Sequence, residues 1–161
     1  MARYAEGTTV TVSQSKAEIE KLLKSKGSDQ QIFGESADGA RVMFRIDDRM
    51  YQFDVPYPDP KDRAFTRNSR GYGLTADRVK ARIDAEIRRR WRVLLIRLKV
   101  KFETVENGAA TIQEEFLANL MLPDGSTMAE YMEPKIEEIY TTGKMPDSLP
   151  GLKALPGRSN S

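Results

Sequence analysis

Residues 75–108 read TADRVKARIDAEIRRRWRVLLIRLKVKFETVENG, and this stretch decides the fold. Its apolar residues recur at spacings of three and four, which is the period of an amphipathic helix. Thr75 is a suitable N-cap, and Asn107-Gly108 is a stop signal. The pattern predicts a helix that runs to about residue 106, roughly 48 Å long, as the scaffold of the domain. The apolar positions are Val79, Ile83, Ile87, Trp91, Leu94, Leu98, Phe102 and Val105.

Three short strands are expected upstream of this helix, near residues 31–35, 42–46 and 51–55. Apolar and polar side chains alternate in the second and third segments, which is typical of a sheet with one buried face. Asp38-Gly39 and Asp47-Asp48 are turn signals between the segments. Pro56, Pro58 and Pro60 then end the sheet, because proline cannot donate to a strand ladder. The sequence therefore predicts an antiparallel meander.

A first helix is expected before the sheet, after an extended segment over residues 1–12. Ser15 and Glu18 have the spacing of a capping box, and Gly27 suits the position after the last turn. The apolar stripe of this helix contains Ile19, Leu22 and Leu23.

Two further helices are expected in the C-terminal third. The first covers about residues 111–119, with Ile112, Phe116, Leu117 and Leu120 inward. After a turn at residues 122–125, Thr127 and Glu130 form a second capping box. The helix that follows has Met128, Tyr131, Met132, Ile136, Ile139 and Tyr140 on one side, and its Pro134 is expected to kink or split it.

The fold class predicted from these elements is α/β of the α+β type. A small three-stranded antiparallel sheet packs on a long central helix, with additional C-terminal helices. Residues 1–150 are expected to form a single domain, and residues 151–161 a flexible C-terminal tail.

The composition excludes several classes of function. The chain of 161 residues contains no cysteine and no histidine. Disulfide frameworks, cysteine-based metal sites and Ser–His triads are therefore excluded within it. Carboxylates are the remaining metal ligands, but Asp47-Asp48 is more typical of a turn. We expect no catalytic residue, no metal and no cofactor, and hence no enzyme. No secretory signal or long apolar run is visible, so we expect a cytoplasmic protein without a membrane partner.

Positive charge is concentrated in one part of the chain. The net charge is +2, yet residues 61–101 carry 14 basic and 4 acidic side chains, a net of +10. The flanking parts, residues 1–60 and 102–161, are net −2 and −6. Such asymmetry favours a surface that binds a polyanion.

The basic segment predicts a nucleic-acid-binding surface made of the loop at residues 57–74 and the helix after it. Arginine suits phosphate, and a loop tyrosine can stack on an unpaired base. DNA is expected more than RNA, possibly single-stranded. The order helix, three strands, helix also occurs in double-stranded-RNA-binding domains, but the loop is too long for that module. The candidate residues are Arg63, Arg67, Arg70, Tyr72, Arg78, Arg82, Arg89 and Arg92.

Two other interpretations stay open. The basic face can have only a structural role, with its arginines paired to the acidic residues of the C-terminal third. Alternatively, that acidic third binds a host protein, as in an accessory or anti-defence factor. Association of the chain with itself, as a homo-oligomer, is a further possibility.

Several segments resemble a family that is widespread in phages and bacterial prophages. They are RYAEGTTV (3–10), SKAEIEKLL (15–23), YPDPKDRAFT (57–66), WRVLLIRLKVKFETVENG (91–108), EEFLANLMLPDG (114–125) and YTTGKMPDSLPG (140–151). The family has no assigned activity. The resemblance therefore implies a phage or prophage origin and transfers no site residues.

Overall fold

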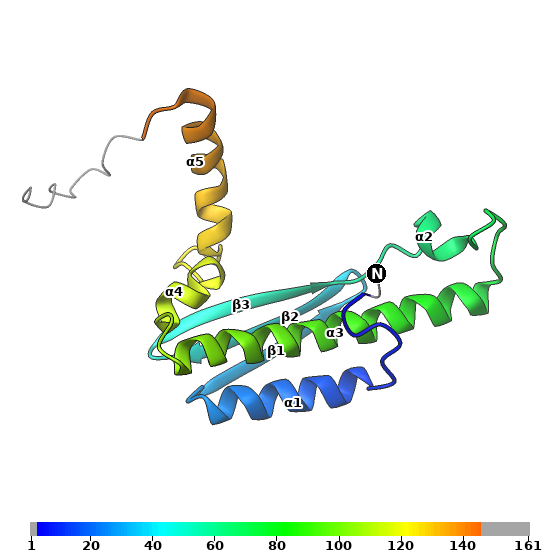
Figure 1. Cartoon of the computed structure of the whole chain (residues 1–161), viewed down its shortest axis with the longest axis horizontal. Coiled ribbons are helices and arrows are strands. Elements are labelled where there is room, and N and C mark those ends of the chain that lie inside the picture. The colour runs from blue at the N-terminus through cyan, green and yellow to red at the C-terminus, as the bar shows by residue number, and fades with distance from the viewer. Residues whose placement is uncertain (1–2, 146–161) are drawn as a thin grey trace, which may run out of the picture.

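The computed structural model describes residues 3–145 and confirms the expected α+β architecture (Figure 1). One long helix lies along a three-stranded antiparallel sheet, and a second helix packs beside it. The elements in chain order are α1 Val12–Ser25, β1 Gln30–Ser36, β2 Gly39–Ile46, β3 Arg49–Pro56, α2 Arg63–Thr66, α3 Ala76–Glu106, α4 Ile112–Phe116, the 3-10 helix η1 Leu117–Asn119, and α5 Met128–Thr142.

The sheet has the order β1-β2-β3, and tight turns connect its strands. Asp47 and Asp48 both have positive φ, 51° and 60°, which matches a two-residue hairpin turn between Ile46 and Arg49. The first turn lies one residue earlier than expected, because Gly39 already pairs with Ser36. A Cβ atom at Gly39 would lie 2.7 Å from the carbonyl oxygen of Val55, so the close approach of β3 requires glycine here.

Helix α1 begins earlier than the Ser15 capping box predicted. Thr11 is its N-cap, and the side chain of Gln14 accepts a hydrogen bond from the Thr11 amide at 2.9 Å. Ser15 lies inside the helix and is fully buried, as are Ile19 and Leu23. The expected extended segment is wrong for residues 4–7, which form turns with positive φ at Ala5 and Gly7. It also ends before Val12, because Thr11 and Gln14 complete a capping box one turn upstream.

Helix α3 has the predicted start and end. The Thr75 side chain caps its first turn, Asn107 ends it, and Gly108 follows with φ +80°. Its apolar stripe covers the sheet. The buried apolar side chains of α3 are Trp91, Leu94, Leu95, Leu98 and Phe102.

Aromatic rings form the centre of the core. Phe116 of α4 lies within 5.0–6.0 Å, between ring centroids, of Phe44, Tyr51, Phe53 and Phe102. The expected packing of α4 is therefore confirmed for Phe116. It is wrong for Leu117, which is 49% exposed because the chain tightens into η1 at this point.

A chain of polar contacts joins α1, β1 and α3 at one end of the sheet. The indole of Trp91 donates to the hydroxyl of Tyr57 at 3.1 Å, and Tyr57 donates to Glu35 at 2.6 Å. Lys16 donates to Glu35 at 2.7 Å and lies over the Trp91 ring. Burial and the Glu35 contact raise the pKa of Tyr57 to about 12, so this hydroxyl remains protonated at neutral pH.

Helix α5 projects away from the rest of the protein (Figure 1). It is a single helix through Pro134, so the expected split is absent, and none of its residues is buried. Its principal packing contact is with η1. The expected tail, residues 151–161, lies outside the described residues. Among residues 3–145, no helix is both long and apolar enough to cross a membrane.

Candidate nucleic-acid interface

The predicted basic loop and the start of α3 form a protruding structure that we call the basic arm, residues 61–82. Figure 1 shows that α2 and the first turns of α3 extend past the end of the sheet, on the side opposite α5. Six of the eight candidate residues lie on this arm. They are Arg63, Arg67, Arg70, Tyr72, Arg78 and Arg82.

The loop within the arm is more ordered than the sequence predicted. Asp62 caps α2, accepting a hydrogen bond from the Ala64 amide at 2.9 Å. The amide of Leu74 donates to the carbonyl oxygen of Thr66 at 2.8 Å, so the two ends of the loop tip are held together. The sequence predicts only a loop over residues 57–74, because the four residues of α2 are too few to show a helical period.

Asn68 organises the loop tip. Its side-chain oxygen accepts hydrogen bonds from the amides of Arg70 and Tyr72, at 3.0 and 2.9 Å. Gly71 has φ +83°, which lets the tip close. The turn thereby presents Tyr72, which is 69% exposed. Asn68 was not among the predicted site residues, although an asparagine three residues before a glycine is a recognisable turn signal.

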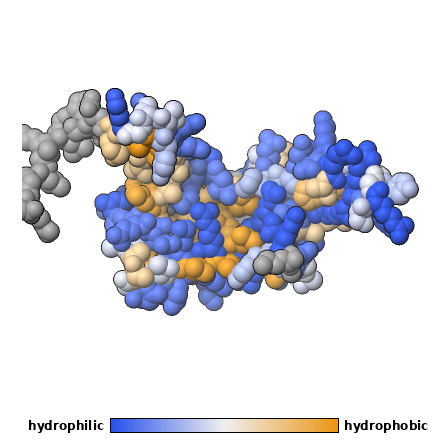
Figure 2. All heavy atoms as spheres, turned by 45° about the horizontal axis from the view of Figure 1, so that its top comes forward, coloured by the Kyte–Doolittle hydropathy of each residue, from blue (hydrophilic) through white to orange (hydrophobic). Residues whose placement is uncertain are grey.

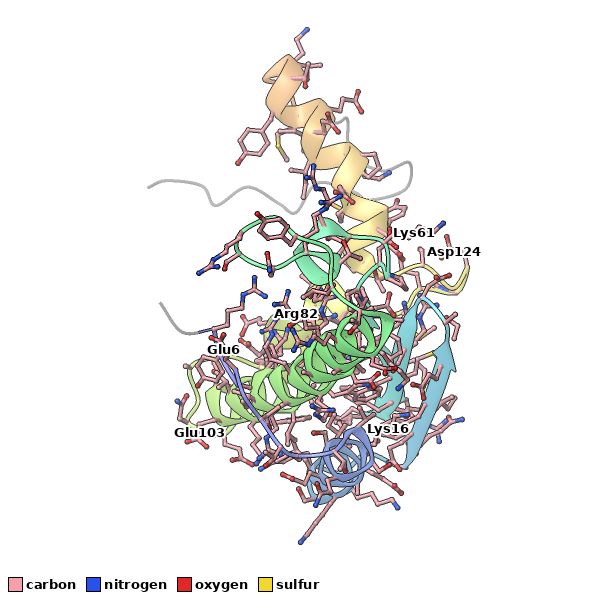
Figure 3. The ribbon with its side chains drawn as sticks, turned by 90° about the vertical axis from the view of Figure 1, so that its right-hand side faces the viewer. Glu6, Lys16, Lys61, Arg82, Glu103 and Asp124 are labelled. Carbon is pink, nitrogen blue, oxygen red and sulfur yellow. The ribbon has the colours of Figure 1, made fainter. Side chains whose placement is uncertain are left out.

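Two arginines of the arm contact neutral carbonyl groups. Arg82 donates to the main-chain oxygen of Arg67 at 2.9 Å, and Arg67 donates to that of Gly71 at 2.8 Å. Figure 3 shows Arg82 on α3 and Lys61 in the preceding loop. A carbonyl orients a guanidinium without neutralising it, so both side chains keep their full positive charge.

The other cations of the arm point into solvent. Arg63, Arg70 and Arg78 are exposed, as is Lys61. Within residues 3–145 none of these four has a carboxylate within 4 Å, and the same holds for Arg67 and Arg82. The arm therefore carries six cationic side chains without an ion-pair partner in the described chain.

The structure places Arg89 and Arg92 apart from the arm, in contacts within the fold. Arg92 donates to Glu18 of α1 at 2.8 Å. Arg89 binds both oxygens of Glu86, at 2.7 and 2.8 Å, and Arg90 binds Glu86 at 3.0 Å. These hydrogen bonds lower the pKa of Glu86 to about 2. Both predicted residues, Arg89 and Arg92, are thus bound by carboxylates of the same chain. A nucleic-acid phosphate would have to compete with those carboxylates for the two guanidinium groups.

The acidic C-terminal third does not cover the basic segment in the described residues. If the basic face had only a structural role, its arginines would pair with acidic residues of this third. The candidates are Glu114, Glu115, Glu130, Glu133, Glu137 and Glu138. Among these, Glu115 alone binds a cation of α3, and that cation is Lys101, at 3.1 Å. The physical reason is the direction of α5, which leads four of these glutamates away from α3.

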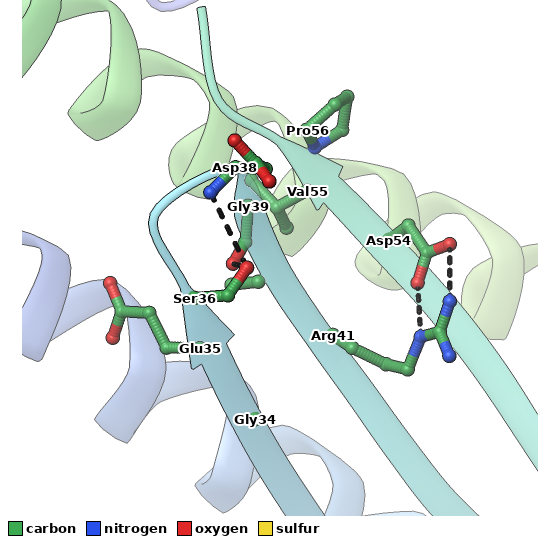
Figure 4. A pocket seen from close by; sticks show the side chains of 10 residues that line it. Gly34, Glu35, Ser36, Asp38, Gly39, Arg41, Asp54, Val55 and Pro56 are labelled. Atoms are coloured by element: carbon green, nitrogen blue, oxygen red, sulfur yellow. Dashed lines mark hydrogen bonds and ion pairs between the residues drawn. The ribbon is translucent and has the colours of Figure 1, made fainter.

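The sheet aromatics and the carboxylates, which the sequence also offers as candidate groups, take part in packing and in ion pairs within the fold. The sheet aromatics Phe44, Tyr51 and Phe53 are buried in the core, which leaves no face open to a base. No three acidic side chains come together as a metal site within residues 3–145. Figure 4 shows a shallow hollow at the β1–β2 turn, where Arg41 binds Asp54 through two hydrogen bonds of 2.7 and 3.1 Å.

Comparisons of the chain with protein-family models, with curated proteins and with solved structures found no match.

Proposed function

We propose that the protein is a phage-type accessory protein that binds nucleic acid through its basic arm. The phage assignment rests on the resemblance of the segments quoted above. The binding assignment rests on one observation, the uncompensated positive charge of the arm.

That charge supports binding for an energetic reason. An arginine held by a carboxylate must exchange one anion for another when it meets a phosphate, so little free energy is gained. The arm arginines have no such partner in the described chain and form charge-assisted hydrogen bonds with phosphate directly. The arm also protrudes, so a strand can reach it without rearrangement of the fold.

Tyr72 favours unpaired bases within this proposal. It is exposed on a turn held by Asn68, with Arg67 and Arg70 close to it in sequence. Stacking on an aromatic ring needs an unstacked base, whereas phosphate contacts alone do not distinguish strands. Single-stranded DNA is therefore the proposed ligand class, and RNA and duplexes are the comparisons to test.

The experiment is charge reversal on the arm. Arg70→Glu combined with Arg78→Glu changes two exposed side chains that form no hydrogen bond or ion pair within residues 3–145. A matched double variant, Lys21→Glu with Arg49→Glu, makes the same change at exposed cations of α1 and β3. Fluorescence anisotropy with a labelled single strand measures binding by both.

We expect the arm variant to lose most of its affinity for the single strand. The matched variant should bind the same strand at least tenfold more tightly than the arm variant does. Equal affinity of the two variants would contradict the assignment of the arm, because net charge alone would then explain the binding.

A second candidate function is binding of a host protein through the acidic C-terminal helices. The exposure of α5 favours it, since Ile136 is 46% and Tyr140 86% exposed. Recovery of one specific protein from host lysate after nuclease treatment would support it.

A further inference from the structure

Arg88 of α3 lies outside the basic arm and shares the main property of the arm cations. It is half-buried, and within residues 3–145 no carboxylate lies within 4 Å of its guanidinium. Asp84, one turn earlier on the helix, binds Lys80 instead, at 2.7 Å. Arg88 therefore carries a positive charge that the described chain does not neutralise.

Arg88 and Arg78 of the arm lie on the same side of α3. Arg78, Ala81, Ala85 and Arg88 have the positions i, i+3, i+7 and i+10, so they fall within a sector of about 80° around the helix. Both alanines are exposed. Asp77 borders this sector, but it lies in the first turn, before Arg78. Between the two arginines this side of α3 thus has only methyl side chains, which let an extended ligand approach the helix closely.

The N-terminal segment crosses α3 beside the arm and encloses a hollow at Arg88 (Figure 1). The hollow has a volume of about 380 Å³. Arg88 and Ala85 line it from α3, and Thr8, Thr9 and Thr11 line it from the N-terminal segment. The Thr9 hydroxyl forms no hydrogen bond within residues 3–145, so it can donate to a ligand. A guanidinium beside threonine hydroxyls is a group of donors that suits a phosphate.

The open cationic surface ends just beyond this hollow. Arg92, the next arginine on the same side of α3, donates to Glu18 of α1 at 2.8 Å. Arg89, besides binding Glu86, donates to the main-chain oxygen of Tyr4 at 3.3 Å. At the other end, Figure 2 shows that the protruding arm has a mostly hydrophilic surface. The uncompensated charge thus extends from the arm to Arg88 and stops there.

We propose that a single strand bound to the arm continues along the Arg78–Arg88 side of α3 and places one phosphate in the hollow at Arg88. Arg88 supplies the ionic contact, and Thr9 supplies a hydroxyl donor. The inference rests on the proposed nucleic-acid function and adds the path of the ligand to it. Arg78 and Arg88 are ten residues apart, about 15 Å along the helix. A strand too short to cover this distance meets the arm alone.

The first experiment removes the charge at the end of the path. Arg88→Gln keeps a polar side chain, and Arg49→Gln makes the same change at an exposed cation of β3. Fluorescence anisotropy measures binding of labelled DNA single strands from about 4 to about 16 nucleotides long. We expect Arg88→Gln to lose about fivefold in affinity for the longest strands and nothing for the shortest. Arg49→Gln should bind like wild type at every length.

The second experiment adds a charge in the middle of the path, so it does not depend on the loss of any contact. Ala81→Lys changes an exposed alanine between Arg78 and Arg88, and Ala129→Lys makes the same change at an exposed alanine of α5. Net charge is equal in the two variants. Ala81→Lys should bind the longest strands about threefold more tightly than Ala129→Lys. Circular dichroism checks the fold of each variant.

Three results would overturn the path. One is equal affinity of Arg88→Gln and Arg49→Gln for every strand, and another is equal affinity of Ala81→Lys and Ala129→Lys. The third is a loss in Arg88→Gln that is the same at all lengths, because Arg88 would then contact the part of the strand that lies on the arm.

The arm variant, Arg70→Glu with Arg78→Glu, distinguishes failure of the path from failure of the proposed function. If it binds as tightly as its matched variant, the proposed function is wrong and the path is wrong with it. If it loses affinity while the changes at Arg88 and Ala81 have no effect, the arm binds the strand and the path alone is wrong.

Discussion

The guanidinium of Arg82 on α3 donates a hydrogen bond to the main-chain oxygen of Arg67, 2.9 Å away in the preceding loop. This contact joins the loop tip to the rigid helix behind it. The charges of α2, the tip and α3 are thereby held in one arrangement, which lowers the ordering cost of binding an extended ligand.

Replacement of Arg82 by glutamine should loosen the loop tip. The shorter amide does not reach the Arg67 carbonyl, so the hydrogen bonds of the tip open more often. We expect faster hydrogen exchange at the amides of Gly71 and Leu74, which donate to Asn68 and Thr66. The free energy of global unfolding should change by less than about 0.5 kcal/mol, because Arg82 is exposed. Unchanged exchange at both amides would contradict this role.

Replacement of Tyr72 by alanine should weaken binding of single strands selectively. Stacking on one base is worth about 1–3 kcal/mol, which corresponds to a loss of about 5- to 150-fold in affinity. Tyr72→Phe keeps the ring and should bind like wild type. Anisotropy titrations with a single strand and its duplex check this. Equal losses with both ligands would show that Tyr72 does not stack on a base.

Replacement of Glu86 by glutamine should destabilise the protein at neutral pH. The pKa of Glu86 falls from an ordinary 4.5 to about 2, chiefly through the hydrogen bond from Arg89. A depression of this size corresponds to about 3 kcal/mol at most. Because the folded pKa is lowered, this stabilisation is complete above pH 4.5 and is lost as the pH falls toward 2. Urea unfolding should show that the variant has a lower free energy of unfolding than wild type at pH 7, and that this difference disappears in acid. A difference that does not depend on pH would mean that the Glu86 side chain stabilises the fold by packing and not by its charge.

Replacement of Phe116 by alanine should remove the ring at the centre of the aromatic core. Deletion of a buried phenylalanine side chain costs about 3–5 kcal/mol, and four other rings lose a contact here. Leu117→Ala is the control one residue later, at a position that is half exposed, and should cost less than about 1 kcal/mol. Thermal unfolding distinguishes the two. Similar melting temperatures would place Phe116 outside the core.

The sequence predicted the elements whose signals are local. The period of α3 and its stop at Asn107 are determined by neighbouring residues, and so is the Asp47-Asp48 turn. The predicted start of α1 is wrong, because Thr11 and Ser15 both begin capping patterns within five residues. The apolar period of the helix does not distinguish between these two possible N-caps.

The predicted site depended on partners that are distant in sequence. Arg92 meets Glu18, 74 positions away, whereas Arg78 and Arg70 meet no carboxylate in the described chain, although all three are arginines of the same basic segment. Likewise, the pattern of α5 shows that the helix has an apolar side but not what covers it. Tertiary contacts decide both points, and sequence spacing does not encode them.

The salt dependence of nucleic-acid binding tests the central claim most directly. Wild-type protein is titrated into labelled single-stranded and double-stranded DNA and RNA at about 50 and about 200 mM salt. If all six unpaired arm cations contact phosphates of a single strand, the logarithm of the affinity should fall with the logarithm of salt with a slope of about −4. Single-stranded DNA should bind most tightly. No binding at the lower salt concentration, or an affinity that salt does not change, would contradict the account.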